Sequence, residues 1–264
     1  MDTTFWRKQK PDQPLFPDLL WSRPEHRKQA GKLLVIGGNL HGFAAPAEAF
    51  VEAGKAGAGT AHVLLPDAVK KLAGGILQTV EYASSTPSGS FSQKALAELM
   101  AESAWADAVL VAGDLGRNSE TAILLEKFAG TYTGQLTLAK DAVDYVTGTP
   151  RVVLGRPDTL LVLSFAQLQK LAAKAGFPKA FTFGMDLLHF VDTLHEFTTE
   201  YKTHIIVKHL DQIHIGSQGQ VVSTVLAEDL EIWRVKTAAQ TAVWWMQNPT
   251  KPLEALATGL TEVK

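Results

Sequence analysis

The chain has 264 residues, of which 46% are hydrophobic and 20% are charged. At roughly 100–200 residues per domain, this length fits one large domain or two small ones. The 25 basic and 27 acidic residues give a formal net charge of −2, so no overall basic excess indicates nucleic acid or an anionic membrane as a partner. The lack of cysteine excludes disulfides, thiolate metal sites, iron–sulfur ligation and a cysteine nucleophile.

Two further features concern location. The first eight residues have no apolar core of the kind that a secretion signal needs. The longest apolar runs, such as 160–165 and 243–246, are much shorter than the ~18 residues that span a bilayer. A cysteine-free composition also fits a reducing compartment. We therefore expect a soluble, cytoplasmic protein.

Residues 1–30 differ in texture from the rest of the chain. They are rich in Pro, Lys, Arg and Gln, with isolated large side chains, namely Phe5, Trp6, Phe16, Leu19, Leu20 and Trp21. This pattern predicts an irregular arm that these side chains attach to the body of the same chain or of a neighbouring subunit. We expect an arm over 1–30, one domain over 31–264, and self-association into a homo-oligomer.

From residue 31 onward, short apolar runs alternate with helical patterns. We expect strands over 32–36, 60–65, 108–112, 135–138, 151–153, 160–163 and 204–208, and a hairpin of 212–216 with 220–224. We expect helices over 46–55, 67–74, 120–128, 165–175, 184–201 and 232–247, and a short terminal helix. Strands that are apolar throughout and separated by helices predict a mainly parallel sheet covered on both faces. The expected fold is a three-layer α/β domain with an antiparallel edge hairpin.

Ligands of such sheets bind at the carboxyl ends of the strands, where loops meet helix N-termini. This rule selects four loops: 37–46, 113–119, 139–145 and the segment between Gln220 and the last helix. The first contains Gly37 and Gly38 directly after a buried strand, but neither a dinucleotide fingerprint nor a Walker sequence. Its glycines fit either amides exposed to an anion or tight strand–helix packing.

The second loop repeats this design. Gly113 and Gly116 could expose amides to a ligand, whereas Asp114 or Asn118 could cap the following helix. Lys208 ends an apolar strand, which suits either a point-charge contact to phosphate or an ordinary exposed strand end. The histidines lack the i, i+4 helical spacing of a metal-binding pair, so we predict no metal site. No serine lies in a Gly-x-Ser-x-Gly elbow, which disfavours a triad hydrolase.

Taken in order, these segments resemble the ADP/ATP-dependent NAD(P)H-hydrate dehydratase family of the ribokinase-like, carbohydrate-kinase-type superfamily. Residues 37–66 are similar to the family's "GGS…GAP…GAG…TP" run, and 113–116 resemble "GPGLG". Residues 138–143 resemble "LDADAL", and 206–208 resemble "LKG".

The resemblance implies a ribokinase-like fold and a repair activity. In the family a nucleotide, ADP or ATP with or without Mg²⁺, drives the removal of water from hydrated NADH or NADPH. The motifs imply that the substrate lies near Ala45 and Gly116, and that the nucleotide phosphates lie near Lys208. The family also implies self-association.

Two segments depart from the family pattern. Ser164 falls where the family's "TPHPGE" segment has a substrate-contacting histidine. Residues 232–235 fall on the "GTGD" signature, so that Val235 occupies the position of the acid/base aspartate. Arg234 could supply positive charge there, and Glu228, Asp229 or Glu231 could replace the lost carboxylate if the register differs. The sequence therefore assigns no catalytic residue.

Three functions follow. The first is a divergent, active NAD(P)H-hydrate dehydratase with a relocated acid/base. The second is a non-catalytic relative that binds a nucleotide, or no ligand, and serves in binding or assembly. The third is a small-molecule kinase of the same fold, which the missing glycine–aspartate signature disfavours equally.

Overall fold

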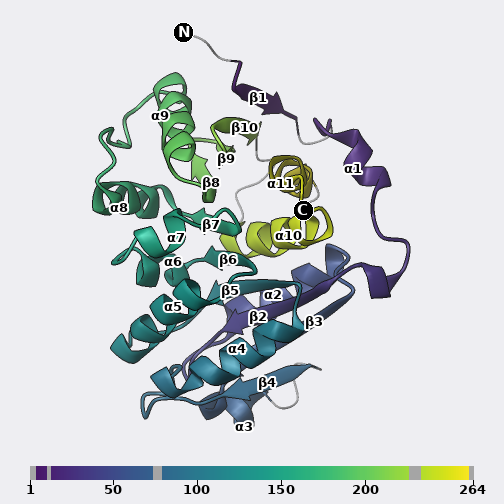
Figure 1. Ribbon diagram of the computed structural model, residues 1–264, viewed down its shortest axis with the longest axis vertical. Coiled ribbons are helices and arrows are strands. Elements are labelled where there is room, and N and C mark those ends of the chain that lie inside the picture. The colour runs from purple at the N-terminus through teal and green to yellow at the C-terminus, as the bar shows by residue number, and fades with distance from the viewer. Residues whose placement is uncertain (1–3, 11–12, 74–78, 226–232, 262–264) are drawn as a thin grey trace.

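The structure is a computed structural model that describes residues 4–10, 13–73, 79–225 and 233–261. Ten strands of these residues form one sheet in the order β1-β10-β9-β8-β7-β6-β5-β2-β3-β4 (Figure 1). The strands are β1 (Trp6–Gln9), β2 (Lys32–Gly37), β3 (Thr60–Pro66), β4 (Val80–Ala83), β5 (Ala108–Gly113), β6 (Gln135–Ala139), β7 (Thr159–Leu163), β8 (His204–His209), β9 (Gln212–Ser217) and β10 (Gln220–Val225).

The sheet is mainly parallel. Strands β2 to β8 all pair in parallel, and the hairpin of β9 and β10 continues the sheet antiparallel from β8. In β5 and β7 every residue is buried, because helices cover both faces of these central strands. The predicted parallel sheet with an antiparallel edge is confirmed.

Helices form a layer on each face of the sheet (Figure 1). One layer consists of α2 (Ala44–Lys55), α10 (Trp233–Gln247) and α11 (Pro252–Thr261), whose apolar side chains share a cluster with Val35 of β2. The other layer consists of α4 (Leu96–Trp105), α5 (Ser119–Thr131), α6 (Asp141–Val146), α7 (Arg151–Leu154), α8 (Phe165–Ala175) and α9 (Leu187–Glu200). The fold is therefore the expected three-layer α/β arrangement.

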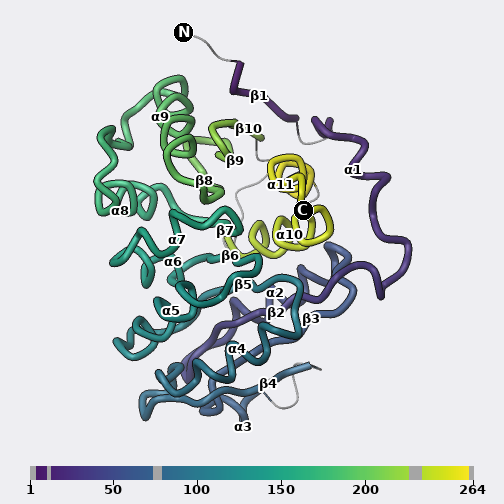
Figure 2. Tube along the Cα trace, in the orientation of Figure 1, coloured from purple at the N-terminus to yellow at the C-terminus, as the bar shows by residue number. Residues whose placement is uncertain are grey.

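Residues 4–10 and 13–30 run along the outside of this body (Figure 2). Strand β1 pairs in parallel with β10, where the Trp6 indole Nε1 donates to Ser223 Oγ at 2.8 Å. Helix α1 (Pro17–Trp21) buries Leu19, whereas Trp21 is 89% exposed and packs little against its own chain. The division of the chain at residue 31 stays a prediction.

Several short elements differ from the sequence prediction. Residues 151–153, predicted as a strand, begin helix α7; Val152 and Val153 have a high strand propensity that packing against α5 overrides. Most of the predicted loop 139–145 instead belongs to α6, which begins at Asp141. The short elements α3 (Lys70–Ala73), η1 (Arg27–Gln29), η2 (Asp67–Val69) and η3 (Gln93–Ala95) complete the assignment. Among the described residues, no helix is both long and apolar enough to cross a membrane.

Candidate functional site

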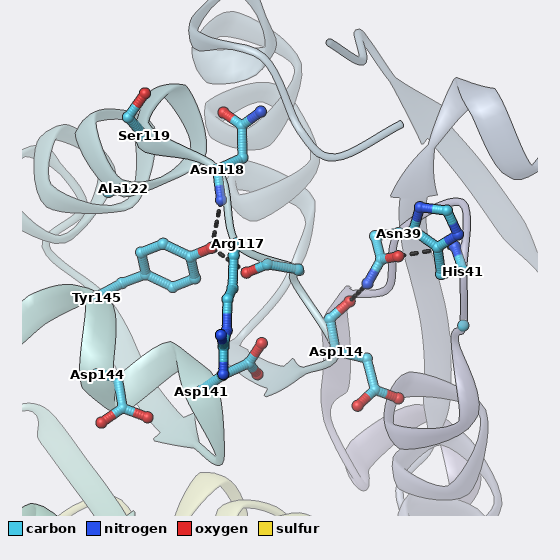
Figure 3. A pocket seen from close by; sticks show the side chains of 12 residues that line it. Asn39, His41, Asp114, Arg117, Asn118, Ser119, Ala122, Asp141, Asp144 and Tyr145 are labelled. Carbon is cyan, nitrogen blue, oxygen red and sulfur yellow. Dashed lines mark hydrogen bonds between the residues drawn. The ribbon is translucent and has the colours of Figure 1, made fainter. Parts of the chain in front are cut away.

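A pocket of about 890 Å³ lies where the loops after β2, β5 and β6 meet (Figure 3). Its walls come from these three segments and from the helices that follow, namely Asn39, His41, Gly42, Asp114, Gly116, Arg117, Asn118, Ser119, Ala122, Asp141, Asp144 and Tyr145. These are three of the four loops that the sequence selects at the carboxyl ends of the strands. Much of the fourth, 226–232, lies outside the described residues.

Glycines allow the first two loops to touch. Gly38 N donates to Gly113 O at 3.0 Å, and a Cβ on Gly37 would lie 2.5 Å from that same oxygen. Gly113 has φ +105°, and a Cβ there would lie 2.6 Å from Asp141 Oδ1. Of the two interpretations of these glycines, close backbone packing is therefore the one that their contacts support.

Asn39 fixes the pocket end of the first loop. Its Oδ1 accepts from His41 N at 2.7 Å, and its Nδ2 donates to Asp114 O at 2.6 Å (Figure 3). Because Asn39 is buried, these bonds hold the two loops in one fixed arrangement.

Asp114 caps helix α2 from the neighbouring loop. Its Oδ2 accepts from Ala45 N at 2.7 Å, and its Oδ1 accepts from Lys140 Nζ at 2.6 Å. Phe43, the residue before α2, makes no side-chain cap of its own. The carboxylate thus satisfies one of the free amides in the first turn and complements the positive end of the helix dipole.

Tyr145 and Asn118 shape the opposite wall (Figure 3). The Tyr145 hydroxyl donates to Gly116 O and accepts from Asn118 N at 3.2 Å. Asn118 Oδ1 caps α5 by accepting from Glu120 N at 2.8 Å, so the predicted capping role falls to Asn118 at α5 and to Asp114 at α2. Gly116 has φ +77°, which a glycine adopts without strain.

Asp141 is the pocket carboxyl with the most unusual environment. Its Oδ2 accepts from Leu115 N at 2.9 Å, while its Oδ1 is buried without a hydrogen-bond partner. Burial raises the pKa of Asp141, and the nearby carboxylate of Asp114 adds to the rise, against the lowering by the Leu115 amide. This carboxyl therefore keeps its proton to a higher pH than an ordinary aspartate.

A chain of hydrogen bonds links the pocket to the start of α10. Arg234 Nη1 donates to Gln167 Oε1 at 3.0 Å, and Gln167 Nε2 donates to Asp144 Oδ2 at 2.9 Å. Burial lowers the pKa of Arg234, and the carboxylates of Asp144 and Asp141 counteract that effect. The first turn of α10 thus lies beside the acidic end of the pocket.

The structure places the three predicted site residues in two areas. Ala45 is 3% exposed with its amide on Asp114, and Gly116 lines the pocket itself. Lys208 is half-buried near the carboxyl end of β8, and strand alternation puts it on the same face as Ile206, the face that α10 covers. Strands β6 and β7 separate β8 from β5, and Lys208 does not line the pocket.

The two departures from the family pattern have defined surroundings. Ser164 is the N-cap of α8 and forms a capping box with Gln167. Val235 is 1% exposed inside α10, within the hydrophobic cluster on that face. Glu228, Asp229 and Glu231 lie outside the described residues.

Sequence reasoning missed the pairing of Asp114 with Lys140 and the roles of Asp141 and Tyr145. The available signal was position, since Asp114 and Lys140 each directly follow a buried strand.

The buried histidines of the antiparallel edge each have their own partner. His204 Nδ1 bonds Ser217 Oγ at 2.8 Å, and His214 Nδ1 bonds Ser223 Oγ at 2.8 Å. Burial lowers the pKa of His204 to about 4 and that of His214 to about 3. Within the described part of the chain, no three His, Asp or Glu side chains are grouped to hold a metal ion.

No family model matches this sequence, and no curated protein matches it. Solved structures do match. A ribokinase-like superfamily protein from Enterococcus faecalis superposes with a TM-score of 0.72 at 15% identity, over 99% of this chain and 88% of that chain. The fold is ribokinase-like.

Two Bacillus subtilis structures also superpose on this chain. The protein YxkO superposes with a TM-score of 0.65 at 11% identity, over 93% of this chain and 85% of that chain. An ADP/ATP-dependent NAD(P)H-hydrate dehydratase, co-crystallized with ATP/Mg²⁺ and soaked with CoA, gives 0.60 at 11% identity, over 91% and 84%. Identities this low establish a shared fold, and function has to be argued from the site.

Proposed function

We propose that this protein binds a nucleotide and acts as a divergent ADP/ATP-dependent NAD(P)H-hydrate dehydratase, which removes water from hydrated NADH or NADPH. The observation that carries the proposal is the pocket itself. Its three loops correspond to the motifs that resemble the family, and they converge around Gly116 with the first turn of α10 beside them. In this proposal the pocket receives the hydrated substrate.

We place the nucleotide phosphates outside the pocket, beyond the point where its loops meet the first turn of α10, near Lys208 and Arg234. Lys208 and α10 lie on one face of the sheet, and the side chains of Lys208 and Arg234 both carry positive charge. The pocket wall instead presents the carboxylate of Asp144, which would repel phosphate. When bound, the nucleotide would supply the driving force for removing water.

Loss of a hydroxyl as water requires a proton donor. Burial raises the pKa of Asp141, so this carboxyl holds its proton to a higher pH than an ordinary aspartate, as a proton donor requires. We assign proton delivery to Asp141 in place of the aspartate that the family carries at the position of Val235.

The second candidate is a non-catalytic nucleotide-binding or assembly protein. One observation favours it: Val235, at the position of the family's acid/base aspartate, is buried in an apolar cluster and cannot transfer a proton. Turnover of NADPH hydrate separates the two candidates, because only the first predicts any.

The test begins with thermal shifts in ADP, ATP and AMP, each with and without Mg²⁺. A nucleotide at 100 times its Kd should add roughly 2.7 kcal/mol to the free energy of unfolding. Lys208→Ala should abolish the shift, whereas Lys202→Ala, an exposed lysine just before the same strand, should keep it. A flat response in the wild type at millimolar nucleotide would reject the proposal.

A positive shift then leads to the activity assay, in which NADPH hydrate and nucleotide should restore the absorbance of the reduced nicotinamide. Asp141→Asn should reduce the rate by about 10²-fold or more if Asp141 delivers the proton. Nucleotide binding without turnover in the wild type would favour the second candidate.

We also propose that the arm takes part in self-association. Trp21 is 89% exposed at the end of α1, an unusual position for so large an apolar side chain. Trp21→Ser should lower the mass measured by light scattering, and an unchanged mass would remove this residue from any interface.

A further inference from the structure

The Asp114 carboxylate occupies a position that is built to bind an anion. Its Oδ2 accepts from Ala45 N at 2.7 Å in the first turn of the twelve-residue helix α2, and its Oδ1 accepts from Lys140 Nζ at 2.6 Å. A first-turn amide and a lysine ammonium together are a donor set that commonly binds phosphate in proteins. Here both donors are already used by a side chain of the same protein.

A second backbone amide beside the pocket is occupied in the same way. Leu115 N donates to Asp141 Oδ2 at 2.9 Å. Two amides at this site, Ala45 N and Leu115 N, are therefore bonded to carboxyl oxygens of the chain. Asp144 adds a third carboxylate to the wall, and its Oδ2 is held by Gln167.

The backbone around this ion pair is unusual. Asp114 has φ +58° and Lys140 has φ +52°, a region that residues with a side chain rarely adopt. Each follows directly after a buried strand, and β5 and β6 are neighbours, so the pair joins two adjacent loops at the floor of the site. Such a conformation persists where surrounding contacts fix it, and it is concentrated at functional sites.

We infer that Asp114 is the specificity-determining residue of this pocket: its carboxylate takes the place of a ligand anion, so that the pocket rejects phosphate and admits an uncharged, hydroxyl- or amide-bearing group. Asp144 accepts hydrogen bonds from such a group, and the Tyr145 ring and the Ala122 methyl group supply apolar surface. The inference rests on the proposed function in one respect, since it states which end of the substrate enters the pocket.

The test measures inorganic phosphate binding to the full chain, by calorimetry and by the ¹⁵N amide signal of Ala45. The wild type should show no saturable change at Ala45. Asp114→Gly, which frees both donors and suits a positive φ, should bind phosphate at least roughly tenfold more tightly, as charge-assisted hydrogen bonds would give. Adding Lys140→Met to this variant should remove the gain.

Asp144→Asn is the matched control, because it raises the pocket charge by the same amount without freeing an amide of α2. It should gain no phosphate binding at Ala45. A gain equal to that of Asp114→Gly would show that the change in net charge alone causes the binding, and it would overturn the inference. Asp114→Asn, which keeps an oxygen acceptor for Ala45 N, decides the question if Asp114→Gly does not fold, and it should show a smaller gain.

Saturable phosphate binding at Ala45 in the wild type, or no gain in any folded Asp114 variant, would overturn the inference. These results are independent of the proposed function, which is judged by nucleotide shifts in the wild type and in Lys208→Ala. A wild type that binds ADP, with Asp114 variants that gain nothing, would reject the inference alone. A gain in Asp114→Gly without nucleotide binding in the wild type would reject the proposed function alone.

Discussion

Polar side chains are used differently at the pocket and at the antiparallel edge of the same sheet. Around the pocket, Asp114 and Asn118 lie in the loop after β5, and Asp141 begins the helix that follows β6. All three accept hydrogen bonds from backbone amides and line an open cavity. At the edge, His204 and His214 lie within strands and bond serines of the adjacent strand. The open cavity therefore lies among loop side chains, whereas the two histidines hold neighbouring strands together.

As the pH falls, groups at the antiparallel edge should lower the free energy of unfolding, whereas a group at the pocket should raise it. The edge should give the larger change. Burial lowers the pKa of His204 to about 4 and that of His214 to about 3. Unfolding restores an ordinary value near 6.5, so the unfolded state takes up protons first as the pH falls. The free energy of unfolding should decrease by roughly 3 kcal/mol per histidine between about pH 7 and about pH 4. Urea unfolding over that range measures it.

The double variant His204→Gln with His214→Gln is the comparison for this experiment. It lacks both titrating groups, so its free energy of unfolding should depend far less on pH. An equally steep pH dependence in the double variant would assign the acid sensitivity to other groups.

Removing the Trp6 side chain should destabilise the edge and spare the pocket. Trp6→Ala loses the hydrogen bond to Ser223 and part of the apolar contact of β1, and should cost about 2–3 kcal/mol in urea unfolding. Arg7→Ala, an exposed position of the same strand, should cost little. Ligand affinity in the pocket should be the same in both variants, and a loss in Trp6→Ala would show that the two regions are coupled.

At the pocket, Gly113→Ala should change both stability and ligand binding. A Cβ at this position would lie 2.6 Å from Asp141 Oδ1 and 2.8 Å from Lys140 Cβ, at a φ of +105°. The cost should be roughly 1–3 kcal/mol, with a loss of ligand affinity as Asp141 shifts. Gly148→Ala is the control, since a Cβ there has no atom within 4 Å. Unchanged ligand affinity in Gly113→Ala would contradict the described contact of the two loops.

The smallest change in the free energy of unfolding is expected for Asp141→Asn. The pH dependence that Asp141 contributes has the opposite sign to that of the histidines. Burial raises the pKa of Asp141, so ionising this carboxyl costs more in the folded than in the unfolded state. That cost is absent at low pH and grows as the pH rises through the pKa of the folded state. The variant keeps an oxygen for Leu115 N, so its stability relative to the wild type should improve as the pH rises. A constant difference from about pH 4 to about pH 7 would contradict the raised pKa.

The central part of the fold could be predicted because its signals are local. Apolar runs such as those of β5 and β7 are buried on both faces, and the hairpin of β9 and β10 has a Gly219 turn. Strand β1 was missed because the sequence Trp-Arg-Lys-Gln pairs along one edge with two of its four side chains exposed, and only tertiary contact makes it a strand.

The position of the pocket could also be predicted, but the hydrogen bonds within it could not. The rule about carboxyl ends of strands selects the loops that line the pocket. The pairing of Asp114 with Lys140 joins residues 26 positions apart through two backbone conformations that no local pattern indicates. For Asp141, the raised pKa depends on burial, which only the packed structure defines.

The central claim is that the nucleotide and the substrate bind at different places. The nucleotide binds near Lys208 and the first turn of α10, and the substrate binds in the pocket. A crystal structure of the protein with ADP or ATP and Mg²⁺ tests it most directly. The account predicts phosphate density beside Lys208 and the first turn of α10, with the pocket between Asn39 and Tyr145 left to a second molecule. Phosphates bound against Asp114 and the Ala45 amide would contradict it.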